Sequence, residues 1–190
     1  MKYIFLGKRV RLSVFLPLTL YLWVIFAGYE TALSSLFAVA VHEAGHILAG
    51  LVMKRKISAV TLSPLGADIK YAGVVSYETE LFSALAGPVF SLISGFLLYG
   101  AFYEFAVISV IYGAVNLIPV PCLDGGRALR CTVYRWAGVL KADMICDAVS
   151  VVFLIIMYLF SVFLLFYTSF NASLLFVCAY VFAESYVKMK

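Results

Sequence analysis

Six stretches of apolar residues, separated by short polar segments, dominate the pattern along the chain. A helix needs about 20 apolar residues to cross the hydrocarbon core of a bilayer, and most of the stretches approach that length, although the first, fourth and sixth are shorter. The pattern predicts an all-α integral membrane protein with about six transmembrane helices. The stretches are Leu12–Gly28, Ala32–Met53, Leu81–Phe102, Phe105–Ile118, Ile145–Tyr167 and Leu174–Val187.

The connection between the second and third stretches, Ile57–Tyr77, has a different pattern. Its sequences "ISAVTLS" and "AGVVSY" are rich in β-branched residues and flank the turn-like cluster "PLGAD". Such runs bounded by glycine and proline are typical of strands joined by a turn. We therefore expect a small membrane-associated β-hairpin or sheet between helices 2 and 3, with an irregular loop as the alternative.

Composition supports a membrane protein. The chain has 190 residues, of which 65% are hydrophobic and 13% charged, with a mean hydropathy of +1.06. Soluble domains are closer to half apolar and one quarter charged. The length predicts one transmembrane domain spanning residues 1–190.

The basic residues indicate how the chain is oriented. With six crossings and a cytoplasmic N-terminus, all 14 lysines and arginines fall on one side of the membrane. Because cytoplasmic loops are enriched in these residues, we expect a multi-pass protein of the cell membrane with both termini in the cytoplasm. The net charge of +4 then reflects topology, and nucleic acid is not expected as a partner.

The second stretch contains the sequence His42-Glu43-Ala44-Gly45-His46. A charged side chain at the centre of a membrane helix costs roughly 2.5–3.5 kcal/mol, which a functional role would explain. Residues four positions apart share one face of a helix, so both imidazoles can bind one Zn²⁺ while Glu43 acts as a base toward water. The alternative is a group of polar residues packed inside a helical bundle.

Catalytic zinc sites usually have three protein ligands. The chain has only two histidines, so a carboxylate is the natural third ligand. Asp124 is the candidate for this third ligand, because we expect it on an extended segment that reaches toward the histidines. The alternative is that Asp124 caps a cytoplasmic turn. Around it, in "NLIPVPCLDGGRAL", two prolines end the preceding helix and two glycines allow a sharp change of direction: Pro119, Pro121, Gly125 and Gly126.

These motifs together resemble a known family. HEAGH on a membrane helix, followed after two further crossings by N-x-x-P and L-D-G, resembles the site-2 protease family of intramembrane zinc metalloproteases. The resemblance covers roughly Ala32–Leu140, and the six-helix layout is most similar to the branch containing the bacterial stage IV sporulation factor FB. It implies His42, His46 and Asp124 as zinc ligands and Glu43 as the catalytic acid/base.

The resemblance also implies a substrate-binding role for Asn116, which could instead bond an inner-wall carbonyl. The implied function is hydrolysis of a peptide bond in or near a membrane-associated segment of a substrate protein. This would be regulated intramembrane proteolysis, of a transcription-factor precursor or an anti-sigma factor, as in sporulation. The expected partners are a membrane protein substrate, regulatory membrane proteins and the lipid bilayer. No CBS or PDZ domain is expected within the 190 residues.

Other functions are also compatible with parts of this sequence pattern. A prenyl-protein-processing peptidase would also carry HExxH, but with a glutamate ligand on a later helix. A metal-binding transporter would be expected to show inverted repeats, and a catalytically silent adaptor would retain the metal alone.

Small residues at every fourth position are interpreted mainly as a helix-packing face: Ser83, Gly87, Ser91 and Gly95.

Overall fold

The computed structural model describes residues 3–5, 10–13, 15–63, 66–73, 75–167 and 173–189. The chain forms two compact units, Met1–Ala114 and Val115–Lys190. The described part is mostly helical and includes a small sheet, as predicted.

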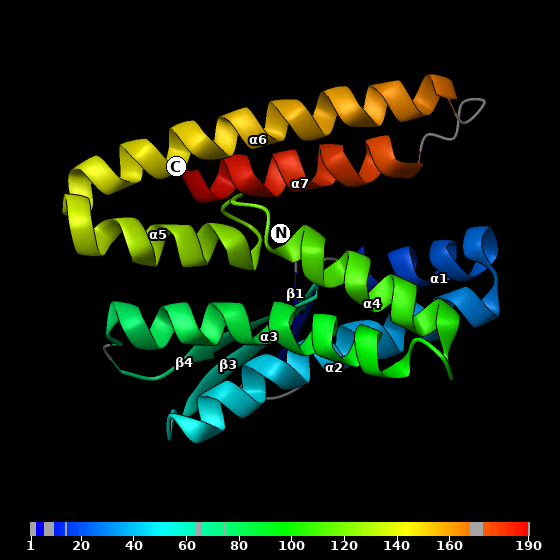
Figure 1. The fold of residues 1–190 in the computed structure, drawn as a ribbon, viewed down its shortest axis with the longest axis horizontal. Helices are drawn as coiled ribbons and strands as arrows, with labels where there is room; N and C mark the ends of the chain where they lie inside the picture. The colour runs from blue at the N-terminus through cyan, green and yellow to red at the C-terminus, as the bar shows by residue number, and fades with distance from the viewer. Residues whose placement is uncertain are drawn as a thin grey trace. The chain divides into compact units, whose positions relative to one another are not determined.

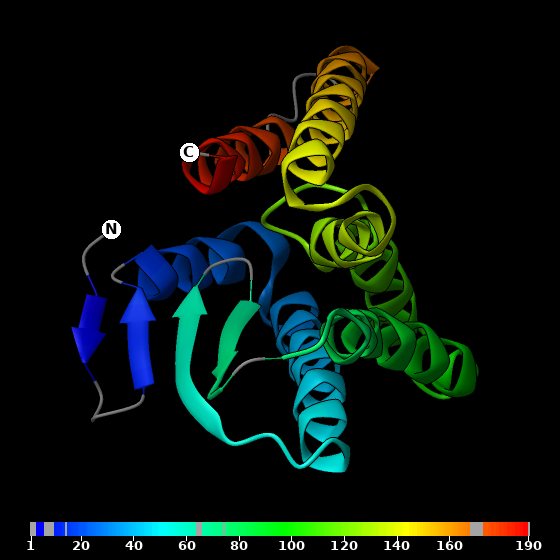
Figure 2. The ribbon, with the colours of Figure 1, turned by 90° about the vertical axis from the view of Figure 1, so that its left-hand side faces the viewer.

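The first unit contains a four-stranded sheet with the order β1-β2-β3-β4. The strands β3 (Ile57–Ser63) and β4 (Gly66–Tyr71) pair in antiparallel fashion, which confirms a hairpin between helices 2 and 3. The predicted position of its second strand, "AGVVSY", was wrong, because β4 begins within the predicted turn cluster and ends at Tyr71. The strands β1 (Tyr3–Phe5) and β2 (Val10–Ser13) extend it, with β2 parallel to β3. Among the described strands β4 lies at one edge of the sheet, next to α2 (Figure 2).

The beginning of the chain differs from the prediction. The stretch Leu12–Gly28 was expected to be one helix, but its first residues belong to β2 and the helix α1 covers only Phe15–Ala27. Thirteen helical residues extend about 20 Å, less than the roughly 30 Å of a hydrocarbon core. The physical reason is the pairing of β2 with β3, which requires an extended backbone.

The apolar part of the chain also forms three long helices and one shorter helix. They are α2 (Tyr29–Val52), α3 (Tyr77–Leu98), α4 (Tyr103–Asn116) and α6 (Val139–Tyr167). Within the described residues, three segments are long and apolar enough to cross a membrane, namely Tyr29–Val52, Tyr77–Leu98 and Lys141–Tyr167. The count of six crossings therefore stays a prediction.

Many small residues lie in the interior of the first unit, and many of its large apolar side chains are exposed. Ala38, Ala84 and Ala106 are fully buried, whereas Phe26 and Phe96 are more than four-fifths exposed. Membrane helices associate through small residues that let their backbones approach closely. Exposed aromatic side chains of this kind would suit a surface in contact with lipid.

The second unit contains α5 (Asp124–Ala137), α6 and α7 (Ser173–Met189). α6 and α7 lie side by side (Figure 1). The helix α5 was not predicted; it is amphipathic and polar, and it ends at Gly138, whose φ of 73° suits a residue without a side chain.

Candidate metal centre and active site

The two histidines of α2 lie close together and away from solvent. His42 and His46 are 2% and 6% exposed, and their Nε2 atoms are 3.2 Å apart. Two nitrogen ligands bound at 2.0–2.1 Å to one tetrahedral zinc ion are separated by about 3.3 Å. The i, i+4 spacing on α2 therefore produces the separation that a shared zinc ion requires.

The other nitrogen of each ring has a partner on α3. His46 Nδ1 lies 2.7 Å from the backbone oxygen of Ser83, and His42 Nδ1 lies 3.0 Å from Ser91 Oγ. Because a carbonyl only accepts hydrogen bonds, His46 Nδ1 carries the proton and its Nε2 presents a lone pair. Metal-binding histidines typically donate their second N–H in this way. The two Nε2 atoms are therefore placed as ligands that fit a zinc ion between them.

Gly87 is the residue of α3 that lies directly beside the Nε2 atoms of the two histidines. A Cβ at Gly87 would lie 2.2 Å from His46 Nε2 and 2.7 Å from His42 Nε2. Three members of the small-residue ladder thus shape the histidine site, with Ser83 and Ser91 as hydrogen-bond partners. Their interpretation as mainly a helix-packing face was incomplete, because helix approach and ligand positioning use the same face of α3.

The carboxylate of Glu43 lies at the beginning of the hairpin strand β4. A Cβ at Gly66 would be 2.6 Å from Glu43 Oε1 and 2.9 Å from the hydroxyl oxygen of Tyr112. Gly66 has a φ of 126°, which side-chain-bearing residues rarely adopt. The glycine therefore lets the hairpin approach Glu43 closely. At the other end of β4, the Tyr71 hydroxyl donates to the backbone oxygen of His46 at 2.9 Å.

Tyr112 is a site residue that the sequence did not predict. Its ring packs edge-on against the His42 imidazole, with centroids 4.8 Å apart and an interplanar angle of 79°. A tyrosine within an apolar stretch carries no special signal, and only its position one helical turn before Asn116 on α4 could have indicated it.

The second unit holds the other two predicted site residues. Asn116 is the last residue of α4 and is 6% exposed. Asp124 is the first residue of α5 and is 7% exposed; Arg127 Nη1 lies 3.2 Å from its Oδ1. The preceding segment 117–123 is not helical. Because the histidines belong to the first unit, the assignment of Asp124 as third ligand stays a prediction.

The two glycines after Asp124 have a different role from the one predicted. Gly125 and Gly126 are helical residues of α5 rather than a change of direction. A Cβ at either position would lie 2.1 Å from a backbone oxygen, that of Leu117 or that of Val120. The glycines are needed because the segment before Asp124 packs directly onto the first turn of α5.

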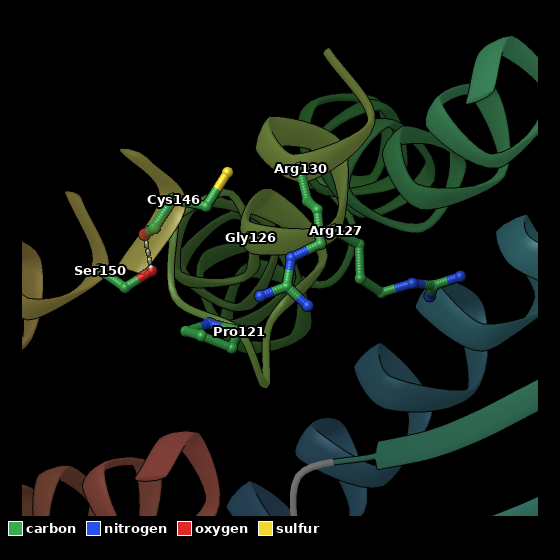
Figure 3. A pocket seen from close by; sticks show the side chains of 6 residues that line it. All are labelled: Pro121, Gly126, Arg127, Arg130, Cys146 and Ser150. Atoms are coloured by element: carbon green, nitrogen blue, oxygen red, sulfur yellow. Dashed lines mark hydrogen bonds between the residues drawn. The ribbon is translucent and has the colours of Figure 1, made fainter. Parts of the chain in front are cut away.

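The arginines of α5 also have defined partners. Arg130 forms ion pairs with two carboxylates of α6: its Nε lies 3.7 Å from Asp143 Oδ1, and its Nη2 lies 3.6 Å from Asp147 Oδ1. Figure 3 shows the side chains of Arg127 and Arg130 pointing in different directions beside a small cavity whose other lining residues are Pro121, Gly126, Cys146 and Ser150. Arg130 thus ties α5 to the beginning of α6.

Comparisons with known proteins agree with this chemistry. Residues 100–160 match the model of peptidase family M50. The chain is 29% identical to the zinc metalloprotease MJ0392 of Methanocaldococcus jannaschii, over 76% of this chain and 45% of that protein. It therefore spans about half the length of this curated relative. These findings support peptidase family M50.

The fold also resembles that of a solved site-2 protease. The site-2 protease from Methanocaldococcus jannaschii matches with a TM-score of 0.73 and 24% identity, covering 100% of this chain and 95% of that one. At this identity the match shows the fold. The site-2 protease resemblance seen in the sequence is supported, and zinc and a membrane location are implied by the M50 match and the metalloprotease relative. The branch of stage IV sporulation factor FB stays a prediction.

Proposed function

We propose that this chain is a membrane-embedded zinc metalloprotease that hydrolyses a peptide bond in or near a membrane-associated segment of a substrate protein. The observation that carries the proposal is the pair of buried Nε2 atoms 3.2 Å apart on the helix that also bears Glu43. This separation is the one that two imidazole ligands of a single tetrahedral zinc ion have. Similarity to a zinc metalloprotease supports zinc as the metal.

The proposed roles follow the chemistry of each residue. His42, His46 and Asp124 hold the metal, which supplies Lewis-acid chemistry toward the scissile carbonyl and the attacking water. Glu43 accepts a proton from the water and later delivers one to the leaving amine. Asn116 hydrogen-bonds the substrate backbone.

The proposed setting is a multi-pass protein of the cell membrane with six crossings and both termini in the cytoplasm, as the basic residues indicate. Its substrate is a membrane protein, such as a transcription-factor precursor or an anti-sigma factor, cleaved in regulated proteolysis.

Removal of the metal tests the proposed activity. The purified full chain, in detergent, should cleave fluorescein-labelled casein, an unfolded substrate that presents extended peptide bonds. Treatment with 1,10-phenanthroline should abolish cleavage, and one equivalent of Zn²⁺ should restore it, whereas Mg²⁺ should not because imidazole ligands favour zinc. A transporter or a silent adaptor would bind zinc and produce no fragments under any of these conditions.

We also propose that β4 holds the substrate in an extended form. A helical substrate hides its carbonyls, and unpaired backbone groups are costly within lipid. An edge strand supplies backbone partners without requiring a particular substrate sequence. β4 supports this role because it lies at the edge of the described sheet and its first residue, Gly66, lies next to the Glu43 carboxylate.

A proline scan along β4 tests strand addition. Proline lacks the N–H donor, and alternate residues of an antiparallel strand direct their backbone groups toward opposite neighbours. Single prolines at positions 67 to 70 should therefore fall into two alternating classes. One class should lower casein cleavage severalfold with unchanged zinc content and an intact β3–β4 hairpin, and the other should disrupt the hairpin. If all four variants cleave at the wild-type rate, β4 does not hold the substrate.

A further inference from the structure

The hydroxyl of Tyr112 and the carboxylate of Glu43 reach the same small space from two different helices. Both oxygens lie within 3 Å of the point where a Cβ of Gly66 would stand. Glu43 comes from α2 and Tyr112 from α4. Because the residue at this point is a glycine, no side chain separates the two groups. The site thus presents a proton acceptor and a hydrogen-bond donor to one region.

The position of Tyr112 is fixed by close packing on both sides. One turn before it, Ser109 Oγ donates to the backbone oxygen of Ser91 on α3 at 3.1 Å. At the next residue, Gly113, a Cβ would lie 2.9 Å from the Cβ of Ser91. The Tyr112 ring also packs against the His42 ring in an edge-to-face pair. A donor held in this way needs no reorganisation when charge develops beside it.

Peptide hydrolysis creates such a charge close to Glu43. The water that Glu43 deprotonates must attack the carbonyl carbon, so the carbonyl oxygen lies within a few ångströms of the Glu43 carboxylate. We propose that Tyr112 is a catalytic residue whose hydroxyl donates a hydrogen bond to the scissile carbonyl oxygen as that oxygen becomes negative. This inference rests on the proposed peptidase function.

The step can be written with every bond and proton placed. Glu43 takes a proton from water, the water oxygen bonds to the carbonyl carbon, and the carbonyl π electrons move to its oxygen, which accepts the Tyr112 hydrogen bond. When the C=O bond re-forms, the C–N bond breaks and the proton on Glu43 passes to the leaving nitrogen. Tyr112 keeps its own proton throughout.

A purely structural role for Tyr112 makes a different prediction. The ring contact with His42 would then matter, and the hydroxyl would not. Tyr112→Phe keeps the ring and removes only the hydroxyl, whereas Tyr112→Leu removes both. Tyr103→Phe is a matched control, because Tyr103 lies on the same helix with 63% of its surface exposed.

The test uses the full zinc-loaded chain in detergent, with fluorescein-labelled casein as substrate and a phosphinic peptide as a mimic of the tetrahedral state. Tyr112→Phe should lower kcat on the order of 10²-fold, the usual cost of losing one oxyanion donor, with KM changed less than threefold. Its affinity for the phosphinic peptide should fall by a similar factor, and its zinc content should equal that of the wild type. Tyr103→Phe should change none of these quantities.

The outcomes separate this inference from the proposed function. If the wild type cleaves casein and Tyr112→Phe has an unchanged kcat, the hydroxyl has no catalytic role. Loss of zinc in Tyr112→Phe, or a rise in KM with unchanged kcat, would likewise overturn the inference in favour of structural support or ground-state binding. If the wild type neither cleaves casein nor binds the phosphinic peptide in a zinc-dependent way, the proposed function itself fails.

Discussion

Glu43→Gln should eliminate proteolysis while leaving the metal in place. Glutamine has nearly the shape of glutamate but does not accept a proton from water, so the general-base contribution of about 10²–10⁴-fold should be lost. The imidazoles, with their partners on α3, are unaffected by the change. Cleavage of labelled casein and zinc content by mass spectrometry are the two measurements.

The matched control is Glu30→Gln, which makes the same change at an exposed position of the same helix. It should have wild-type activity. If Glu43→Gln cleaves casein at a rate close to that of the wild type, Glu43 is not the base. If it instead loses its zinc, the carboxylate belongs to the metal site.

Gly87→Ala should remove both zinc and activity. The added methyl group would lie 2.2 Å from His46 Nε2, so the imidazoles must rotate away or α3 must move away from α2. Changes in groups that only orient metal ligands lower affinity about 10–100-fold, and direct displacement of both nitrogens should cost at least the upper end of this range. Zinc affinity is measured by competition with a chromogenic chelator.

Gly100→Ala is the control for this experiment, because the space around a Cβ at Gly100 is open for 4 Å. This variant should bind zinc and cleave casein as the wild type does. Helical content from circular dichroism should be the same in both variants. A Gly87→Ala chain with full zinc affinity would contradict the placement of α3 against the histidines.

The histidine pair could be predicted from the sequence because it depends only on residues that are close together in the chain. Two histidines four residues apart on a helix must share a face, and this spacing allows the 3.2 Å between their Nε2 atoms once α3 orients the rings. The hairpin was likewise visible, since β-branched runs and a turn-like cluster lie next to one another in the chain. The identity of the third ligand depends on the resemblance to known proteases.

The features that could not be predicted depend on partners distant in sequence. β2 is four residues long and is extended because it pairs with β3, whose paired residues lie fifty positions later in the chain. Gly87 and Tyr112 look ordinary in their own helices, and their importance arises only from contacts with α2. The helix α5 was missed because Gly125 and Gly126 suggest a turn, whereas packing against the preceding segment is what requires them.

The arrangement of α2 and α3 has a consequence for how such a chain can diverge. One helix contributes both imidazoles, and the other contributes both of their hydrogen-bond partners together with the glycine between them. Insertion of a single residue in either helix would rotate the residues beyond it by about 100° and turn these contacts away from their partners. We therefore expect that α2 and α3 can be exchanged with those of a related chain only as a pair, whereas substitutions on their exposed sides should be tolerated.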